Sequence, residues 1–165
     1  MRVLGIDPGT AVTGYGVIDN DGGNLALVIC GALTTPRRAT AAERLHFLYQ
    51  EICKVIRQHH PDVLAVEQPF VAKNARTALV IGRAQAMALL AAAASNIPCY
   101  EYTPASVKQS VTSYGAGSKA QVQEMVRLQL SLAEAPTPDD AADALAVAIT
   151  HLNDVHLSNL LSGGN

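Results

Sequence analysis

Two short apolar segments of this chain each end in a carboxylate, and this pattern constrains the fold more than any other feature. Residues 2–7 read Arg-Val-Leu-Gly-Ile-Asp, and residues 62–67 read Asp-Val-Leu-Ala-Val-Glu. Both predict buried strands, and a charge left uncompensated at the end of such a strand costs on the order of several kcal/mol. Taken alone, Asp7 fits two interpretations equally well, because it either begins an Asx-type turn into Pro8-Gly9 or contributes to a metal site.

Two further strands are expected directly after the first one. Residues 14–19 and 25–33 are apolar enough for strands, and the second alternates in hydrophobicity. The sequence Asp-Gly-Gly-Asn at 21–24 between them is typical of a hairpin turn. We therefore expect the chain to open with a three-stranded antiparallel meander, whose first turn covers residues 8–13.

The pattern then changes to that of a helix. Apolar residues recur with helical spacing over residues 40–59, and Thr40 with Glu43 predicts a capping box at its start. A strand–helix–strand connection would place the segment 62–67 parallel to the first strand. In open α/β sheets, functional sites form at the carboxyl ends of parallel strands. Glu67 is therefore expected beside the acid that ends the first strand.

The second half of the chain predicts one more strand and several helices. Residues 76–95 form an Ala-rich stretch typical of a long helix, and 97–102 predicts a fifth strand at the sheet edge, because Pro98 lacks an N–H donor. Three more helices are expected: one over 104–111, one capped by Ser118 and one that opens at Asp139. We expect one domain over residues 1–153 and a frayed tail over 154–165.

Composition narrows the class of protein. Hydrophobic residues make up 49% of the chain, while aromatic residues make up 4% and Trp is absent, so the core must be aliphatic. We find no apolar run long enough to span a bilayer and no signal-peptide pattern. The three cysteines are far apart and show neither zinc-site spacing nor a disulfide pattern. A reducing cytoplasm fits this composition best, with no membrane association.

The formal net charge of −2 argues weakly against a nucleic-acid-binding protein. If four carboxylates are committed to metal ions, however, the charge of the remainder changes from −2 to +2. Local patches rather than the total charge attract phosphates. The basic residues are indeed grouped along the chain: Arg37 and Arg38, then Lys73, Arg76 and Arg83, then Lys108, Lys119 and Arg127.

The last helix begins with acids that are not all explained by its N-terminus. Asp140 and Asp143 lie three residues apart and share one helix face. An Asp at a helix start caps free N–H groups, and either Asp139 or Asp140 has this role. Capping does not explain Asp143, which lies between alanines with no Lys or Arg in the next two turns, so it needs a partner. Asp139 shares the face of Asp143 as well, and spacing alone does not distinguish it from Asp140.

These acids together predict metal chemistry. If the strand-end acids and the helix acids converge, each close pair repels by about 4 kcal/mol at an effective dielectric of 20. Such a cluster holds protons or a divalent cation, and oxygen ligands without Cys or His select Mg²⁺ or Mn²⁺. Two ions about 4 Å apart stabilise both the attacking and the leaving oxygen of a phosphoryl displacement. The sequence has no Walker-type loop, so we expect a phosphodiester substrate rather than a nucleoside triphosphate.

Two residues outside the acids have both a structural and a functional interpretation. Phe70, in the loop at 68–74, either tucks beneath that loop or wedges against an unpaired base. Lys119 lies in the first turn of its helix, where a positive charge opposes the helix dipole. That position is tolerable at the surface and also suits a residue that meets phosphate.

Six segments carry a resemblance to a known family. They are Gly5-Ile6-Asp7-Pro8-Gly9-Thr10, Thr13-Gly14-Tyr15-Gly16-Val17, Glu67-Gln68 followed by Phe70, Lys73 and Asn74, Val107-Lys108-Gln109, Lys119 with Val122-Gln123, and Asp140-Ala-Ala-Asp143-Ala-Leu-Ala. Each segment is weak alone, but the set covers nearly the whole chain in one order and spacing. It resembles the RuvC Holliday-junction resolvases.

The resemblance implies a ribonuclease H-like α/β fold, with a mixed five-stranded sheet flanked by helices. It implies a homodimer that cuts two opposing strands of a four-way DNA junction in recombination and repair. Hydrolysis would use two Mg²⁺ ions per subunit, with Mn²⁺ as an alternative, and would leave 5′-phosphate and 3′-hydroxyl ends. A RuvAB-type branch-migration complex is the implied partner, and the apolar helix over 76–95 is our candidate for the dimer contact.

The resemblance also assigns roles to individual residues. It implies that the metal ligands and catalytic residues are Asp7, Glu67, Asp140 and Asp143. Asp140 is favoured over Asp139 because the family's motif is D-x-x-D. The implied DNA contacts are Phe70, Lys73, Arg76, Lys108 and Lys119, with Phe70 as the aromatic residue that opens the junction. One departure from the family pattern is Pro69, which stiffens the loop before Phe70.

Three other functions remain as alternatives. A ribonuclease H-like nuclease acting on hybrids or ends would share the fold and the acids. An actin-like ATPase or sugar kinase would share the Asp7-Pro-Gly-Thr turn, but 165 residues cannot hold the two domains that such enzymes need. A non-catalytic junction-binding protein would bind DNA without cutting it.

Overall fold

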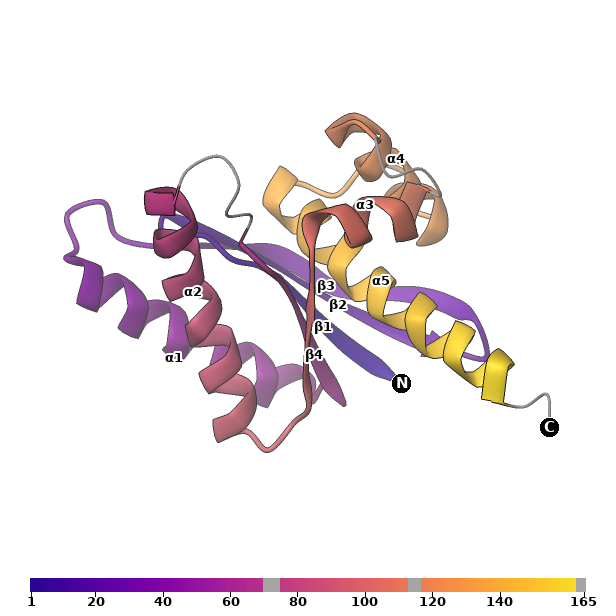
Figure 1. The fold of residues 1–165 in the computed structure, drawn as a ribbon, viewed down its shortest axis with the longest axis horizontal. Coiled ribbons are helices and arrows are strands. Elements are labelled where there is room, and N and C mark those ends of the chain that lie inside the picture. Colours follow the sequence, from indigo (N-terminus) through magenta and orange to yellow (C-terminus); the bar gives the residue numbers. More distant parts are fainter. Residues whose placement is uncertain (70–74, 113–116, 163–165) are drawn as a thin grey trace.

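The computed structural model describes residues 1–69, 75–112 and 117–162 of the chain. Its elements, shown in Figure 1, are β1 (Arg2–Asp7), β2 (Val12–Asp21), β3 (Asn24–Thr34), α1 (Ala41–His59), β4 (Val63–Glu67), α2 (Ala75–Ala94), β5 (Cys99–Tyr102), α3 (Pro104–Thr112), α4 (Lys119–Gln129) and α5 (Asp139–Ser162). The capping boxes at Thr40 with Glu43 and at Ser118 with Gln121 begin α1 and α4.

The first strand is the centre of the sheet. The strand order is β3-β2-β1-β4-β5, with β1 antiparallel to β2 and parallel to β4. β2 and β3 are antiparallel, and β4 and β5 are parallel. The expected meander, the parallel crossover and the edge position of the fifth strand are therefore confirmed. This order brings the last residues of β1 and β4 to the same edge of the sheet.

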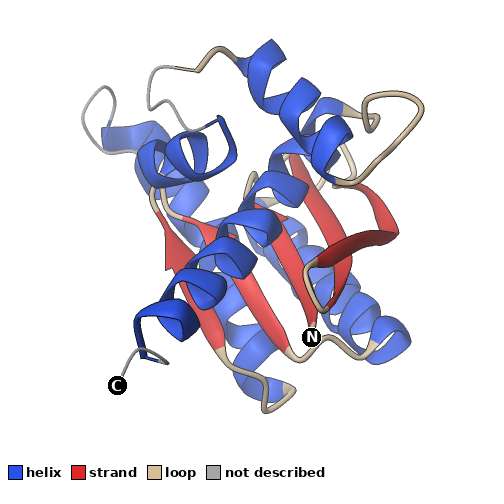
Figure 2. Ribbon diagram, turned by 90° about the vertical axis from the view of Figure 1, so that its right-hand side faces the viewer, coloured by secondary structure: helices blue, strands red, loops and turns tan. Residues whose placement is uncertain are grey.

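Helices cover both faces of the sheet, because alternate residues of each strand point to opposite sides. In β1, Val3 packs in the cluster beneath α3, α4 and α5, while Leu4 and Ile6 pack in the cluster beneath α1 and α2. Figure 1 shows these two helical layers on either side of the strands, and Figure 2 shows α5 lying across the front of the sheet. The largest fully buried side chains are all Leu, Ile or Val, as the composition predicted.

Three glycines on the inner strands let α5 approach the sheet closely. Gly5 and Gly16 face each other across β1 and β2, and Gly14 lies opposite Asp7 in the same ladder. A Cβ on Gly5 would overlap the carbonyl oxygen of Ala144, and a Cβ on Gly14 would overlap that of Asp140. Glycine is therefore required at these positions by the nearness of the helix backbone. The position of α5 along the sheet is fixed by this contact.

The long helix α2 has an apolar outer face. Its buried side, which includes Ala84 and Ala88, packs against α1 and β4. On the other side, Leu79 and Leu90 are 59% and 51% exposed. By length and composition alone α2 could cross a membrane, but a helix with one side in the core of a folded domain passes the same test. The exposed leucines instead mark α2 as a surface that a partner could cover.

The C-terminal end differs from the expectation. The polar segment from residue 154 onward is not irregular, because α5 continues without a break to Ser162. Beyond Leu152 this helix leaves the sheet, and Leu157, Leu160 and Leu161 are all more than half exposed. Helical hydrogen bonds within the segment are sufficient to continue a regular helix that begins in the core.

Candidate active site

Two of the predicted acids lie side by side at the carboxyl edge of the central strands. Ile6 of β1 pairs with Val66 of β4, and each of these residues is followed directly by the acid that ends its strand, Asp7 or Glu67. Both carboxylates are only partly exposed. The strand-end pattern therefore brings the two acids together as expected.

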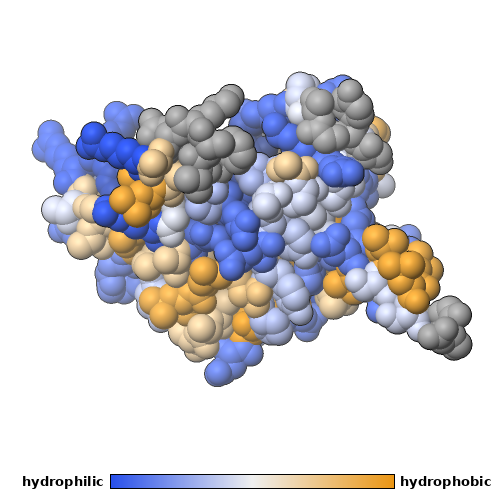
Figure 3. Space-filling model, in the orientation of Figure 1, coloured by the Kyte–Doolittle hydropathy of each residue, from blue (hydrophilic) through white to orange (hydrophobic). Residues whose placement is uncertain are grey.

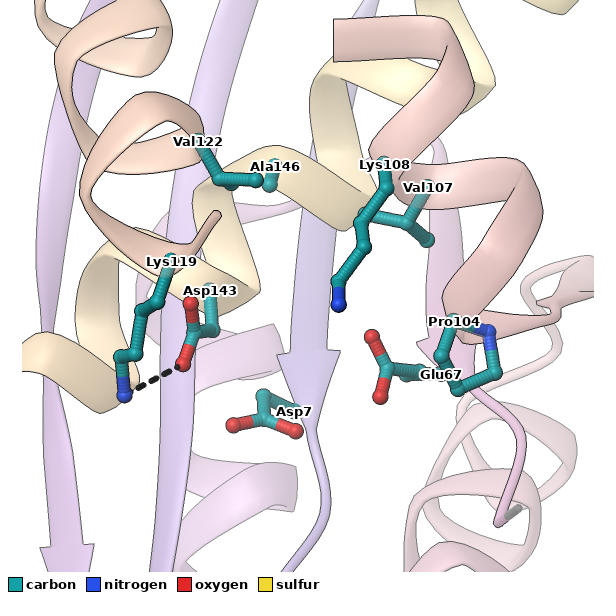
Figure 4. A pocket seen from close by; sticks show the side chains of 9 residues that line it. All are labelled: Asp7, Glu67, Pro104, Val107, Lys108, Lys119, Val122, Asp143 and Ala146. Carbon is teal, nitrogen blue, oxygen red and sulfur yellow. Dashed lines mark ion pairs between the residues drawn. The ribbon is translucent and has the colours of Figure 1, made fainter. Parts of the chain in front are cut away.

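The helix acids reach the same edge from above the sheet. The backbone of Asp140 lies directly over Gly14, the residue that pairs with Asp7 across the ladder. One turn further along α5, Asp143 points towards the strand ends (Figure 4). The close approach of α5 to the glycines of the sheet therefore sets the position of both helix acids.

A cavity of about 260 Å³ lies at this edge, and three of the four predicted acids line it. Figure 4 shows Asp7, Glu67 and Asp143 around the opening, with Lys108 from α3 and Lys119 from α4 reaching in from the side. Its remaining wall is apolar: Pro104, Val107, Val122 and Ala146. These apolar residues carried no signal in the sequence beyond their helical spacing. Asp140 does not line the cavity.

The carboxylates at the strand ends hold protons more tightly than usual. Burial, and then the charges of Asp143 and Asp140, raise the pKa of Asp7 to about 6. Burial, and then the charges of Asp7 and Asp143, raise the pKa of Glu67 to about 7, although Lys108 opposes this shift. Neighbouring carboxylates therefore disfavour ionisation of Asp7 and Glu67. This is expected of a cluster of acids that the protein's own cations do not fully neutralise.

The partner that Asp143 lacks on its own helix comes from α4. The Nζ of Lys119 lies 3.1 Å from one oxygen of Asp143 and 3.5 Å from one of Asp139. Burial raises the pKa of Asp143 all the same, because the opposing effect of Lys119 is smaller. The hydrogen bond to Asp143 in turn raises the pKa of Lys119. The sequence spacing did not indicate this pair, because the two residues belong to different helices.

The donor set fits a hard divalent cation, although the side chains are not arranged around one. Among the described residues, no three His, Cys, Asp or Glu side chains are close enough to hold an ion as they stand. All-carboxylate oxygen ligands favour Mg²⁺ or Mn²⁺.

Arg76 is the remaining predicted site residue that the structure describes, and it does not line the cavity. Arg76 lies in the first turn of α2 and is exposed. Asp139 is also exposed and contacts the site only through its ion pair with Lys119. Phe70 and Lys73 lie outside the described residues.

The metal-free protein is expected to lose stability as the pH rises from about 4 to about 7. In the folded chain the pKa of Asp7 is about 6 and that of Glu67 is about 7, both above their usual values. The folded state therefore keeps protons that the unfolded chain has already released, and this advantage is gone above both pKa values. The expected loss of unfolding free energy is on the order of 2–4 kcal/mol. Urea unfolding with a chelator, at several pH values across this range, measures it.

The variant Asp7→Asn provides the comparison, because it differs from the parent chain at one of these two acids alone. Its stability should depend less on pH than that of the parent chain. Added Mg²⁺ above about pH 7 should raise the urea midpoint of the parent chain by neutralising the acids, and should raise that of the variant less. Equal pH dependence in the two proteins would show that Asp7 does not hold a proton in the folded state.

The sequence and the structure match proteins of one family. A family model described as crossover junction endodeoxyribonuclease RuvC matches residues 3–151. The crossover junction endodeoxyribonuclease RuvC of Chloroflexus aggregans is 56% identical over 151 residues, which cover 92% of each chain. That of Dehalococcoides mccartyi is 52% identical over 165 residues and covers 100% of this chain and 99% of its own. The structure of Thermus thermophilus RuvC in complex with Holliday junction substrate superposes with a TM-score of 0.89, at 34% identity and 96% coverage of both chains.

Proposed function

The chain belongs to the RuvC family of crossover junction endodeoxyribonucleases and resolves Holliday junctions, and we propose that four of its carboxylates form the catalytic centre. These are Asp7, Glu67, Asp140 and Asp143. The observation that carries the proposal is that Asp7, Glu67 and Asp143 line one cavity together with Lys108 and Lys119. Acids that raise one another's pKa beside unpaired or weakly paired cations are typical of sites that bind metal and phosphate together.

The family is metal-dependent, and the carboxylates of this chain suit Mg²⁺, with Mn²⁺ as the alternative. We infer that Asp7 is the central ligand, because it lies on the middle strand between Glu67 and the helix acids. Two bound ions would activate the attacking water and stabilise the leaving 3′ oxygen, so that the products carry 5′-phosphate and 3′-hydroxyl groups. Because Asp7 and Glu67 must release protons to bind a cation, metal affinity should rise with pH up to about 7.

The two lysines are proposed to bind the phosphate that is cut. The Nζ of Lys108 points into the cavity towards Glu67 in Figure 4, and no ion pair ties it to an acid within the described residues. Lys119 is paired with Asp143 in the metal-free chain. Once a cation neutralises Asp143, the ammonium group of Lys119 is free to contact a phosphate oxygen. Lysines at this position would hold the scissile diester against the carboxylates and oppose charge build-up on it.

Residues that follow Glu67 along the chain are proposed to hold the junction open. By its place in the family motif, Phe70 stacks against an unpaired base at the exchange point, and Lys73 contacts the backbone beside it. Arg76 is exposed in the first turn of α2, directly after the same loop, and would extend this contact. These contacts would select a branched substrate over a continuous duplex.

A homodimer is proposed from the apolar face of α2. Leu79, Val80 and Leu90 are exposed on this helix, and an apolar stripe of this kind is suited to pair with its own copy about a two-fold axis. Two sites related by such an axis match the pseudo-symmetry of a four-way junction, so that opposing strands are cut as a pair. A cytoplasmic location and a RuvAB-type branch-migration complex as partner complete the proposal.

A synthetic mobile four-way junction tests the function directly. With Mg²⁺ or Mn²⁺ we expect paired cuts in two opposing strands and products that a ligase can rejoin, and we expect no cuts in linear duplex of the same sequence. Ca²⁺ serves as a binding control. Cuts in hybrids or at ends would identify another ribonuclease H-like nuclease instead. Junction binding without cleavage under all ions would identify a non-catalytic binding protein.

A further inference from the structure

A second basic surface adjoins the active site on the opposite face of the sheet. The segment that joins β3 to α1 carries Arg37 and Arg38, and both side chains are exposed. In Figure 1 this segment lies at the same end of the molecule as the start of α2, on the side of the sheet away from α3 and α4. Neither arginine belongs to the catalytic cavity.

This segment is attached to the turn that follows Asp7. The hydroxyl of Thr35 donates to the carbonyl oxygens of Thr10 at 2.9 Å and Ala11 at 3.2 Å. The backbone N–H of Thr35 also donates to the Ala11 carbonyl, at 3.0 Å. Thr35 is buried, so these bonds are protected from water. The segment that carries the arginines is therefore bonded to Thr10, which lies three residues along the chain from the proposed metal ligand Asp7.

Arg44 of α1 gives the segment its shape. Its guanidinium donates to the carbonyl oxygens of Ala39 at 3.1 Å and Arg37 at 2.8 Å. These acceptors are neutral, so the positive charge of Arg44 is not cancelled by the contacts that it makes. A short segment tied at both ends loses less conformational entropy when it binds a ligand than a free loop would.

The positive charges on this surface have no acidic partner. Within residues 1–69, 75–112 and 117–162, no ion pair involves Arg37, Arg38, Arg44 or Arg83, whereas Arg2 and Arg127 are each paired with an acid. The nearest acid in the chain is Glu43, and its carboxylate accepts from the N–H of Thr40 at 2.7 Å and from the hydroxyl at 2.9 Å. These two bonds lower the pKa of Glu43 and hold it in the helix cap.

A cavity of about 210 Å³ connects this segment with α2. It is lined by Thr10, Ala41, Arg44, Leu45, Val80 and Arg83. Arg83 is exposed on α2 and lies on the same helix face as Leu79 and Leu90, so it borders this surface from the side of the proposed dimer contact. Figure 3 shows strongly hydrophilic surface at this end of the molecule. The turn after Asp7 thus lies between lysines on one face of the sheet and arginines on the other.

We propose that Arg37 and Arg38, with Arg44 as their support, form a second phosphate-binding surface that holds one duplex arm of the junction. The contact is with the sugar–phosphate backbone and does not depend on base sequence, because arginine side chains outside a groove read only phosphate. The surface keeps the arm in register with the strand that lies in the catalytic cavity. This inference rests on the proposed function, since it assumes a branched DNA substrate.

The double variant R37A/R38A tests the surface, with K54A/R57A as its matched control. Each double variant removes two positive charges from exposed side chains. Lys54 and Arg57 lie in the last part of α1, at the end of the helix away from Arg37 and Arg38. For R37A/R38A we expect about tenfold weaker junction binding, with the slope of log affinity against log salt reduced by about 2. The control should match the parent chain in affinity and slope.

The conservative variant R37K/R38K separates charge from structure. It keeps the positive charge, and we expect binding within about threefold of the parent chain. If it binds as weakly as R37A/R38A, or if R37A/R38A keeps the parent slope, the phosphate-binding surface is ruled out. A parent chain that cuts no junction at all would instead overturn the proposed function, so the two failures are distinct.

Discussion

The variant Asp7→Asn is expected to cut a four-way junction at least about 1,000-fold more slowly than the parent chain while it still binds the junction. The carboxylate of Asp7 lies at the end of the central strand, and its pKa is raised by burial and then by the charges of Asp143 and Asp140. An amide of the same shape carries no charge with which to hold a cation, and a loss of about 4 kcal/mol of transition-state stabilisation corresponds to this factor. Binding should remain or improve slightly, because one charge that repels phosphate is gone. Single-turnover cleavage and a mobility-shift titration in Ca²⁺ measure the two effects.

Asp139→Asn is the matched control. It makes the same chemical change one turn before Asp143, and Asp139 contacts the site only through an ion pair of 3.5 Å with an exposed lysine. We expect its cleavage rate to stay within a few-fold of the parent chain. A large loss in Asp139→Asn would mean that this acid, rather than Asp140, is the third ligand. A loss of junction binding in Asp7→Asn would contradict a purely catalytic role for Asp7.

The strand-end acids could be predicted from the sequence because their pattern is local. An apolar run that ends in an acid gives both the strand and the position of the side chain, and the helical segment between the two runs gives the parallel arrangement. Asp7 and Glu67 therefore meet at one edge, as expected. The caps of α1 and α4 are local in the same way, since each cap residue and the residue three positions later exchange hydrogen bonds between side chain and backbone.

The parts that depend on contacts between distant segments could not be predicted. Lys119 was expected to face phosphate, and its ion pair with Asp143 became visible only when α4 and α5 were placed side by side. Asp140 was expected among the acids of the site, yet it lies beside the cavity rather than in its wall. No sequence rule indicated that α5 would stay helical to Ser162, because the residues after Leu152 are polar or exposed and have no core to pack against.

The glycines beneath α5 are the other feature that only the structure explains, and they lead to the second strong prediction. Gly14→Ala should lower the free energy of unfolding by about 3 kcal/mol, which for a chain of this size is a fall in Tm of about 10 °C. The new methyl group would overlap the backbone carbonyl of Asp140, and two backbones cannot relieve an overlap as a flexible side chain can. Either β2 or the start of α5 has to move. That movement carries Asp140 and Asp143 away from Asp7, so we expect junction cleavage to fall as well, when it is assayed far below the new Tm.

Gly82→Ala is the control for this prediction, because it adds the same methyl group where there is room. A Cβ at Gly82 would lie 3.8 Å from the nearest atom, in Pro69, which is an ordinary contact. Alanine inside α2 should even favour the helix by up to about 1 kcal/mol.

If Gly14→Ala melts like this control, α5 does not press on the sheet as closely as the structure indicates. If Gly14→Ala melts early yet cuts at the parent rate while folded, the contact stabilises the fold without setting the distance between the helix acids and Asp7. Only a loss of both stability and cleavage supports the view that the spacing of the four acids is built on a backbone contact between a glycine and a helix.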